Sequence, residues 1–474
     1  MADMRSKLNE IYSLEQLSSK NTVIHRIHPL MKMIVTILYI VLLLMMNRYN
    51  LFGLALFLFY PMIVIPLAEI PYKVIFGRTL VTIPFVAFAG ISNIIFDRDR
   101  VVLISGVVIT AGALSFCVLI VRTILSVSAV LILVATTKFQ DITRQLRVLH
   151  VPTFFIHLIE MIYRYVSVLL EEAFTMMTAY RLRNPRLKYP HIKHMGIFVG
   201  HLFLRSMDRA ERIYSAMKCR GYGGKITKKK LMEERFDTML KIENLTVKYP
   251  DNTIAVNDFS ISVENGEKVA LVGANGAGKS TLMLAIEGIL ESTGKIQVGD
   301  LVLTKDNIVE IRQKAGMLFQ NPDDQLFMGT IYDDIAFGPR NMGMDEESVR
   351  YRVEDRLRLL GIEHLRDKTA LKMSGGEKRM AALATVLAVK PSVMLLDEPT
   401  AFLDPQARRK LINVLNSLPH TMLIATHDLA FAKEVCKWVV VMKNGAVFAQ
   451  GSCEKVLFDE MLMENGGLEA IQRE

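Results

Sequence analysis

Hydrophobic and polar positions follow two different patterns along this chain of 474 residues. Up to about residue 135, long apolar runs are separated by short polar turns. From about residue 239, short apolar stretches alternate with glycine-rich turns and amphipathic segments. The first pattern predicts membrane-spanning helices, and the second predicts an α/β domain. We therefore expect a helical membrane domain over residues 1–224, a charged linker over 225–238 and an α/β domain over 239–474.

Four apolar runs are predicted to span the membrane: residues 33–46, 51–67, 79–96 and 101–135. A short polar turn joins the first two as a hairpin. The first run falls short of the roughly 20 residues that cross a bilayer, so a hairpin buried in a soluble core is the alternative. The fourth run is apolar except for Arg122 and is interpreted as one long helix, straight or broken.

Two long amphipathic helices are predicted next, over residues 153–184 and 195–220. Each carries polar side chains at steps of three or four, and each ends in an arginine beside a helix breaker. Arg183 precedes Pro185, and Arg220 precedes Gly221.

Charge and cysteine usage agree with a membrane protein that faces the cytoplasm. The net charge is +9, and the basic run 228–230 stands beside the apolar half, which favours lysine and arginine held at the cytoplasmic membrane side over nucleic-acid binding. Four spans place both chain ends on that side. The four cysteines lie far apart without CxxC spacing, which argues against a disulfide framework or a zinc ribbon. The pairs His25/His28 and His191/His194 are interpreted as helix-face residues, not metal ligands.

A phosphate-binding loop follows the apolar strand predicted at residues 269–272. Its glycines let backbone N–H groups turn toward phosphate oxygens, and the following helix adds the positive end of its dipole. Lys279 is expected to reach the terminal phosphates of ATP, and Ser280 is expected to bind Mg²⁺. The residues assigned to the nucleotide here are Gly273, Ala274, Asn275, Gly276, Ala277, Gly278, Lys279, Ser280 and Thr281.

Two carboxylates end a second apolar strand, predicted at residues 393–396. Asp397 suits the Mg²⁺ side of the site, and Glu398 is placed to polarise the attacking water. Solvated acids at a strand end are the alternative, which the phosphate loop upstream disfavours.

A second anion-binding turn opens a helix at residues 373–379 and resembles the signature motif of ATP-binding cassette (ABC) ATPases. That resemblance implies that Ser374, Gly375, Gly376 and Glu377 cap the γ-phosphate of ATP held by a second ATPase subunit. By order and spacing, it also implies an adenine-stacking role for Tyr249, a Q-loop role for Gln320 toward Mg²⁺ and the membrane partner, a dimer-facing role for Asp404 and a γ-phosphate contact for His427. Phe402 departs from the family, which often has a small residue there.

Residues 319–327 resemble the A component of energy-coupling factor importers, a likeness that covers about residues 240–458. The first half resembles the T component of the same systems, in which two coupling helices end in arginines that enter the two ATPase subunits. Arg183 and Arg220 match those arginines. The family's hydrophobic helix after the second arginine motif is absent.

The resemblance implies an ATP-hydrolysing coupling subunit in the cell membrane, with a cytoplasmic ATPase domain. Its expected cofactors are ATP and Mg²⁺. Its expected partners are a second ATPase subunit, of the same or another chain, and a small substrate-binding membrane protein; nucleic acid is not expected. An ABC exporter half, and a soluble ABC ATPase acting on nucleic acid or the ribosome, are the alternatives. The cargo, a vitamin or a cobalt or nickel ion, stays open.

Overall fold

The computed structural model describes residues 17–47, 49–97, 100–102, 108–183, 192–223 and 237–472. The chain forms two compact units, Met1–Ile162 and Tyr163–Glu474. The boundary lies inside the long helix α10 (Thr153–Arg183) and not near residue 224. The reason is that α11 (Ile192–Cys219) packs against α14 (Pro322–Gln325) and β8 (Ala315–Leu318) of the α/β domain and belongs to the second unit. The predicted linker, 225–238, lies almost entirely outside the described residues.

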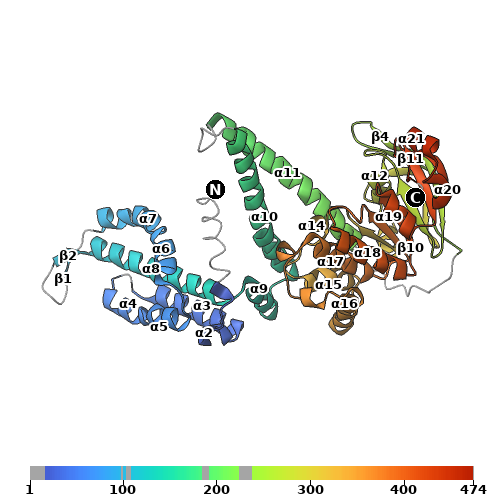
Figure 1. The fold of residues 1–474 in the computed structure, drawn as a ribbon. Helices are drawn as coiled ribbons and strands as arrows, with labels where there is room; N and C mark the ends of the chain where they lie inside the picture. The colour runs from blue at the N-terminus through green and yellow to red at the C-terminus, as the bar shows by residue number, and fades with distance from the viewer. Residues whose placement is uncertain are drawn as a thin grey trace. The chain divides into compact units, whose positions relative to one another are not determined.

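Helix α8 (Ala111–Thr136) is the centre of the first unit. It contacts α3 (Pro29–Met45), α4 (Leu51–Phe57), α5 (Phe59–Leu67), α6 (Tyr72–Leu80) and α7 (Ile83–Phe96), and Figure 1 shows it between α7 and the α3–α5 group. Leu43, Val118 and Leu125 form part of the buried core. Helices α2 (Val23–Arg26) and α9 (Phe139–Val148) also belong to this unit.

The predicted spans appear as helices of unequal length. Within the described residues, α8 is the one helix long and apolar enough to cross a membrane alone, and α6 with α7 forms a second candidate that is bent by 47°. The predicted span 51–67 is divided at Leu58 into α4 and α5. Helix α3 is apolar but shorter than a full span.

The prediction of a single helix over 101–135 is wrong at its start. Arg100–Val102 (β1) and Val108–Thr110 (β2) pair as antiparallel strands, and α8 begins only at Ala111. β-Branched residues dominate both strands and favour extended backbone. Thr110 then caps the helix by accepting a hydrogen bond from the Ala113 N–H at 3.3 Å.

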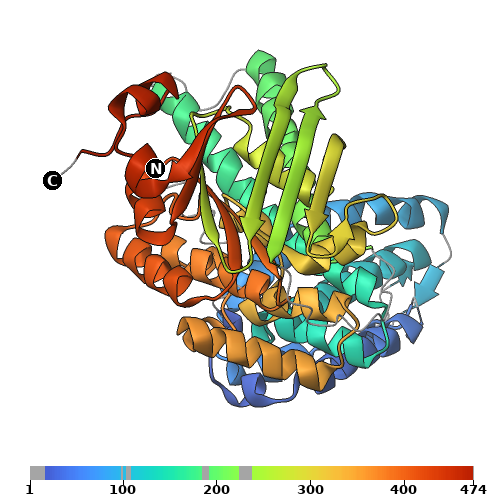
Figure 2. The same cartoon turned by 90° about the vertical axis from the view of Figure 1, so that its right-hand side faces the viewer.

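The second unit contains two sheets, as the predicted α/β domain requires. The larger has the order β12-β11-β5-β10-β9-β8, with β12 antiparallel to β11 and the remaining pairs parallel. Its strands are β5 (Lys268–Val272), β8 (Ala315–Leu318), β9 (Val393–Asp397), β10 (Thr421–Thr426), β11 (Trp438–Lys443) and β12 (Ala446–Ser452). The antiparallel sheet β4-β3-β6-β7, whose long strands β3 and β4 stand out in Figure 2, comprises β3 (Thr238–Lys248), β4 (Ile254–Glu264), β6 (Ser292–Val298) and β7 (Leu301–Val302).

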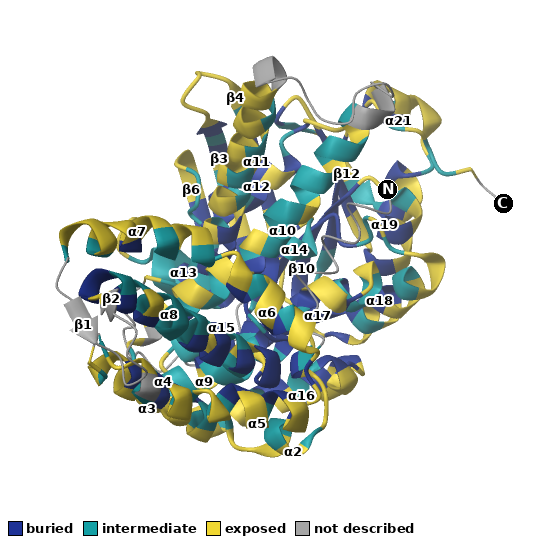
Figure 3. Ribbon diagram, turned by 90° about the vertical axis from the view of Figure 1, so that its left-hand side faces the viewer, coloured by how far each residue is buried: buried dark blue, intermediate teal, exposed yellow. Residues whose placement is uncertain are grey.

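The helices of the α/β domain pack around these sheets or against one another. They are α12 (Lys279–Ile286), α13 (Ile308–Lys314), α14 (Pro322–Gln325), α15 (Ile331–Asn341), α16 (Glu346–Leu360), α17 (Gly375–Leu387), α18 (Pro405–Ser417), α19 (Leu429–Val435), α20 (Cys453–Val456) and α21 (Glu460–Asn465), with 3₁₀ turns at Glu363–Leu365 and Ala370–Lys372. Strands β5, β8, β9 and β10 of the larger sheet are buried along almost their whole length, as the dark blue strands of Figure 3 indicate, whereas the edge strand β12 is partly exposed. The expected architecture, a helical domain followed by an α/β domain with a helical and an antiparallel β part, is confirmed.

Candidate nucleotide site and coupling contact

The phosphate loop runs from the end of β5 to the start of α12, where the sequence predicts it. Gly278 has φ of 105° and is the N-cap residue of α12. A Cβ atom at Gly278 would lie 2.3 Å from the Ala255 carbonyl oxygen, and one at Gly273 would lie 2.4 Å from that of Met442. Glycine is therefore required at both positions, by backbone conformation at Gly278 and by close approach at both.

The Lys279 side chain is bonded to its own phosphate loop and is expected to exchange these bonds for bonds to phosphate. Its ammonium donates to the Gly273 carbonyl at 2.7 Å and to the Ala274 carbonyl at 3.2 Å, and the side chain is buried. Burial lowers the Lys279 pKa, while Glu398 and Asp397 act in the opposite direction. The ammonium is thus a buried cation whose present partners are neutral carbonyls that phosphate oxygens can replace.

Ser280 and Asp397 fit a divalent cation. The Ser280 hydroxyl hydrogen-bonds to the Asp397 carboxylate, whose Oδ1 atom is buried and has no hydrogen-bond partner among the described residues. Burial raises the Asp397 pKa. A buried carboxylate oxygen beside a serine hydroxyl is the oxygen donor set that Mg²⁺ prefers.

Glu398 and His427, the predicted catalytic pair, contact each other. His427 Nδ1 lies 2.8 Å from Glu398 Oε2, and the His427 backbone N–H donates to the same oxygen at 3.3 Å. Glu398 is buried and has φ of 46°, in the left-handed region that non-glycine residues rarely adopt. Such local strain is typical of residues whose position matters for function.

One cleft of about 630 Å³ joins most of the predicted nucleotide residues. Asn275 to Thr281, Gln320, Glu398 and Tyr249 line it, together with Thr253, Ile254, Ala255, Asn444 and Gly445. The Tyr249 hydroxyl lies 3.0 Å from the Thr281 hydroxyl, so the predicted adenine-stacking ring stands beside the phosphate loop. Thr253 to Ala255, at the start of β4, and the Asn444-Gly445 turn between β11 and β12 were missed by the sequence reasoning because ordinary strand starts and strand turns have the same residue types.

The signature turn and Asp404 do not line this cleft. Ser374 caps α17 in a capping box, accepting from the Glu377 N–H at 3.3 Å while Glu377 Oε2 accepts from the Ser374 N–H at 2.8 Å. Asp404 caps α18 by accepting from the Ala407 N–H at 2.9 Å. A Cβ atom at Gly376 would lie 2.7 Å from the Ala407 Cβ, so these two helix starts pack closely.

Arg379, one turn into α17, connects the signature helix with the Q-loop. It is buried and donates to the carbonyls of Phe319 at 2.8 Å and Gln320 at 2.6 Å. Burial lowers its pKa to about 10. Lys378 binds the Asp323 carboxylate at 2.9 Å. Nothing in the local sequence distinguishes Arg379 from a surface arginine of an amphipathic helix.

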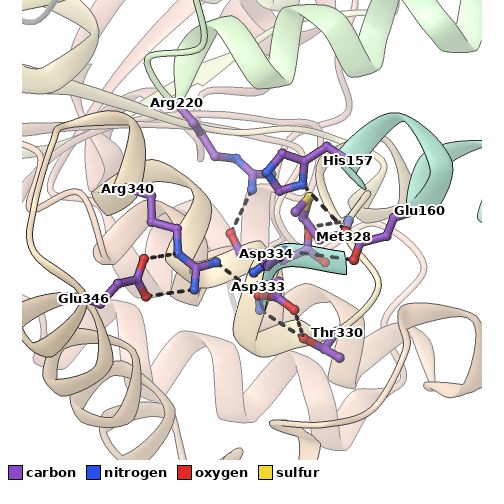
Figure 4. Close-up of polar contacts among 10 residues, drawn as sticks. His157, Glu160, Arg220, Met328, Thr330, Asp333, Asp334, Arg340 and Glu346 are labelled. Atoms are coloured by element: carbon purple, nitrogen blue, oxygen red, sulfur yellow. Dashed lines mark hydrogen bonds and ion pairs between the residues drawn. The ribbon is translucent and has the colours of Figure 1, made fainter. Parts of the chain in front are cut away.

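Arg220 is buried against the α/β domain of its own chain, within the second unit. It donates to the backbone carbonyls of Gln325 and, at 3.2 Å, Asp334, and its guanidinium lies 4.9 Å from the centre of the Phe327 ring. The Asn341 amide donates to the Arg220 carbonyl at 3.0 Å. Figure 4 shows Arg220 directed at Asp334, with the neighbouring Arg340 bound to Asp333 and Glu346.

Two more arginines join this contact and were not assigned a role from the sequence. Arg164 of α10 is buried and donates to the Met328 carbonyl at 3.0 Å, and Arg212 of α11 binds Asp324 at 2.8 Å. Asp334 Oδ1 accepts from the N–H groups of Phe327 and Met328. Arg183 is the last residue of α10, and its side chain lies outside the described residues.

Two family models match the chain. The one described as a cobalt transport protein matches residues 20–231, and the ABC transporter model matches residues 256–401. A Carboxydothermus hydrogenoformans protein named as the energy-coupling factor transporter ATP-binding protein EcfA is 41% identical over 49% of this chain and 87% of its own length. The chain belongs to the energy-coupling factor transporters.

Other relatives of this energy-coupling factor protein are named as parts of ABC transporters. A Geobacter sulfurreducens protein named as an ABC transporter ATP-binding protein is 43% identical over 49% of this chain and 93% of its own length. A solved structure described as cbiO1 from Clostridium perfringens, part of the ABC transporter complex cbiONQ, is 38% identical, covers 48% of this chain and 94% of its own, and has a TM-score of 0.44. The two family models, together with these named relatives, show that the chain is an ATPase of a transporter, with its transport domain fused to its ATP-binding domain.

Proposed function

We propose that this chain is the energy-coupling subunit of an importer, in which α10 and α11 transmit closure of an ATPase dimer to a separate substrate-binding membrane protein. The first unit is proposed to cross the bilayer at the four predicted spans, with the ATPase in the cytoplasm. The observation that carries the proposal is the burial of Arg220, at the end of α11, against the segment that directly follows the Q-loop.

Catalysis is assigned to Glu398, which accepts a proton of the attacking water as its oxygen bonds to the γ-phosphorus of ATP, while the bond from that phosphorus to the β–γ bridging oxygen breaks and ADP leaves. His427, 2.8 Å from Glu398, orients that carboxylate and contacts the γ-phosphate. Lys279 exchanges its loop carbonyls for phosphate oxygens. Mg²⁺, when bound by Ser280, Asp397 and Gln320, would neutralise charge on the β- and γ-phosphates.

The coupling path follows from contacts within the second unit. Segment 319–325 is held from one side by α17, through Arg379 and Lys378, and from the other by α11, through Arg212 and Arg220. A shift of Gln320 on nucleotide binding therefore moves a segment to which α11 is bonded. Because these bonds are charge-assisted and largely buried, the helix end follows the segment instead of sliding over it.

A second ATPase subunit is needed for the signature turn to act. The turn opens α17 with backbone N–H groups at a helix N-terminus, which favours an anion, yet it stands outside the cleft of its own phosphate loop. Ser374 to Glu377 are thus proposed to close over ATP bound by the partner. The description of the matching membrane family makes a cobalt ion the first cargo to test.

Arg220→Glu tests the coupling role, with Arg205→Glu as the matched control. Arg205 is on the same helix but its side chain is 61% exposed and pairs with Glu172. We expect Arg220→Glu to abolish cobalt uptake by cells that produce the complete transporter while the purified complex still hydrolyses ATP, and Arg205→Glu to transport normally. Unchanged uptake with Arg220→Glu would refute the coupling role.

A further inference from the structure

A polar cavity of about 460 Å³ lies in the first unit, away from the nucleotide site. It is lined by the end of α7 (Ser92, Asn93, Phe96 and Asp97), by α8 (Ser115, Val118, Leu119 and Arg122) and by Tyr49 of the α3–α4 turn. Its volume lies in the range of small-molecule sites, about 300–1,000 Å³. Neither the proposed coupling function nor the family assignment uses it.

Arg122 is the cation of this cavity. It interrupts an otherwise apolar helix and donates to the Met46 carbonyl at 2.7 Å, which caps the end of α3. Its buried Nε atom has no hydrogen-bond partner among the described residues, and it forms no ion pair with any of them. A guanidinium has five N–H donors, so one carbonyl leaves most of its capacity for an anion.

Asp97 is the anion of the same cavity. Its Oδ2 atom accepts a hydrogen bond from the Tyr49 hydroxyl at 2.8 Å, and it too forms no ion pair with a described residue. The backbone holds it in place, because the Gly112 N–H donates to the Asp97 carbonyl at 2.9 Å. A Cβ atom at Gly112 would lie 2.6 Å from that carbonyl oxygen.

Arg122 and Asp97 thus line one cavity without pairing with each other. Unpaired charges in an apolar surrounding are costly, and an occupant that carries both signs relieves both at once. The complementary ligand has an anionic group that binds Arg122 and an amine that binds Asp97. Further polar partners for it line the cavity: Ser92, Asn93 and Ser115.

The surroundings of the cavity favour a lipid as the source of those charges. The outer face of α7 that leads to it is apolar and highly exposed, with Phe88 at 82% and Phe96 at 83%, and Ile91 and Ile95 continue the stripe. The Arg122 contact with Met46 places the cavity at the depth of the polar α3–α4 turn, where headgroups lie if α3 and α4 span the bilayer as proposed.

We propose that this cavity binds the headgroup of a zwitterionic aminophospholipid, with its phosphate on Arg122, its amine on Asp97 and its acyl chains along α7. The site rests on the proposed membrane insertion of the first unit but not on the coupling role of α10 and α11. If the lipid-binding test fails, the uptake test of Arg220 is unaffected. If the uptake test fails, the lipid proposal still stands.

Native mass spectrometry of the full-length chain, purified in mild detergent, tests the site. We expect one phosphatidylethanolamine to remain bound to the unmodified chain. In Arg122→Gln, its retention should fall by about tenfold or more, as expected for the loss of hydrogen bonds between charged groups, and Arg122→Lys should restore part of it. Arg144→Gln, on the exposed face of α9, is the matched control and should retain the lipid.

Asp97→Asn separates headgroup recognition from stability, since it changes one charge and keeps the shape. Delipidated chain offered equal amounts of phosphatidylethanolamine and phosphatidylglycerol in nanodiscs should select the amine lipid, and Asp97→Asn should lose that preference. If Arg122→Gln does not fold, as judged by size-exclusion chromatography, this variant still decides the question. Equal retention by all variants, no bound lipid, or competition by soluble phosphoethanolamine as effective as the lipid itself would overturn the proposal.

Discussion

The nucleotide cleft and the coupling contact, both in the second unit, treat buried charge in opposite ways. In the cleft, Lys279 is bonded to loop carbonyls, and Asp397, behind the cleft residue Ser280, has an Oδ1 atom without a partner among the described residues, so both have capacity for a ligand. At the coupling contact, Arg220 donates to two backbone carbonyls and Arg164 to a third. The first region is built to receive charge, and the second is built to hold two segments together.

The largest expected effect is the loss of hydrolysis in Glu398→Gln. Without a carboxylate, the attacking water keeps its proton, and we expect the ATPase rate to fall by about 10²-fold or more while ATP still binds. Phosphate release and nucleotide binding by the purified complex measure the two separately. Glu347→Gln, on the exposed side of α16, is the matched control. Near-normal turnover by Glu398→Gln would remove Glu398 from the reaction.

The next largest effect is expected from Asp334→Asn at the coupling contact. Asp334 is fully buried, and its carboxylate counters Arg164 and Arg220, while burial raises its own pKa to about 6. An amide keeps an acceptor for Phe327 and Met328 but leaves two buried cations without their counter-charge. We expect a loss of about 3 kcal/mol in the free energy of unfolding.

Denaturant unfolding of the purified chain measures that loss, and Asp355→Asn, whose side chain is 41% exposed, is its control. An equal response of the two variants would mean that the buried arginines do not depend on Asp334. Buried charge at the coupling contact would then not stabilise the packing of its two segments, and the contrast with the nucleotide cleft would fail.

The sequence predicted the nucleotide cleft far better than the coupling contact. Gly273 to Thr281 are consecutive, and their roles follow from a strand, a glycine turn and a helix, so local order is enough. Arg164 reaches a carbonyl at Met328, and Arg220 reaches one at Gln325, across more than a hundred positions. Periodicity shows only that Arg164 lies on a polar stripe; the partner that buries it is set by tertiary packing. The start of α8 was missed for a related reason, because the capping hydroxyl of Thr110 is ambiguous within a long apolar run.

A smaller effect, visible as pH dependence, is expected from Glu287 at the end of α12. Glu287 is fully buried, with Cys219 of the coupling helix and Arg312 beside it, and burial raises its pKa to about 8. An acid whose pKa is raised on folding contributes stability below its unfolded pKa of 4.5, and that contribution is lost as pH rises toward 8. Glu287→Gln should therefore flatten the decline of melting temperature between pH 5 and pH 8.

Differential scanning fluorimetry of both proteins across that range measures the difference. Parallel curves would show that Glu287 does not titrate there. Glu464→Gln, on the exposed side of α21, is a suitable control and should leave the slope unchanged.

The smallest stability effect is expected from Ser374→Ala, and it sharpens the comparison most. In the single chain, the Ser374 hydroxyl caps α17, so its loss should cost about 1 kcal/mol, as for other N-caps. Asp345→Ala removes the equivalent cap of α16, where Asp345 accepts from the Ser348 N–H at 2.9 Å, and should cost the same. If the signature turn also receives the partner's γ-phosphate, only Ser374→Ala should lower the ATPase rate beyond what its stability explains. Equal ATPase rates in the two variants would mean that Ser374 only caps α17. The ligand-binding region would then consist of the cleft of a single subunit, without the signature turn of a partner.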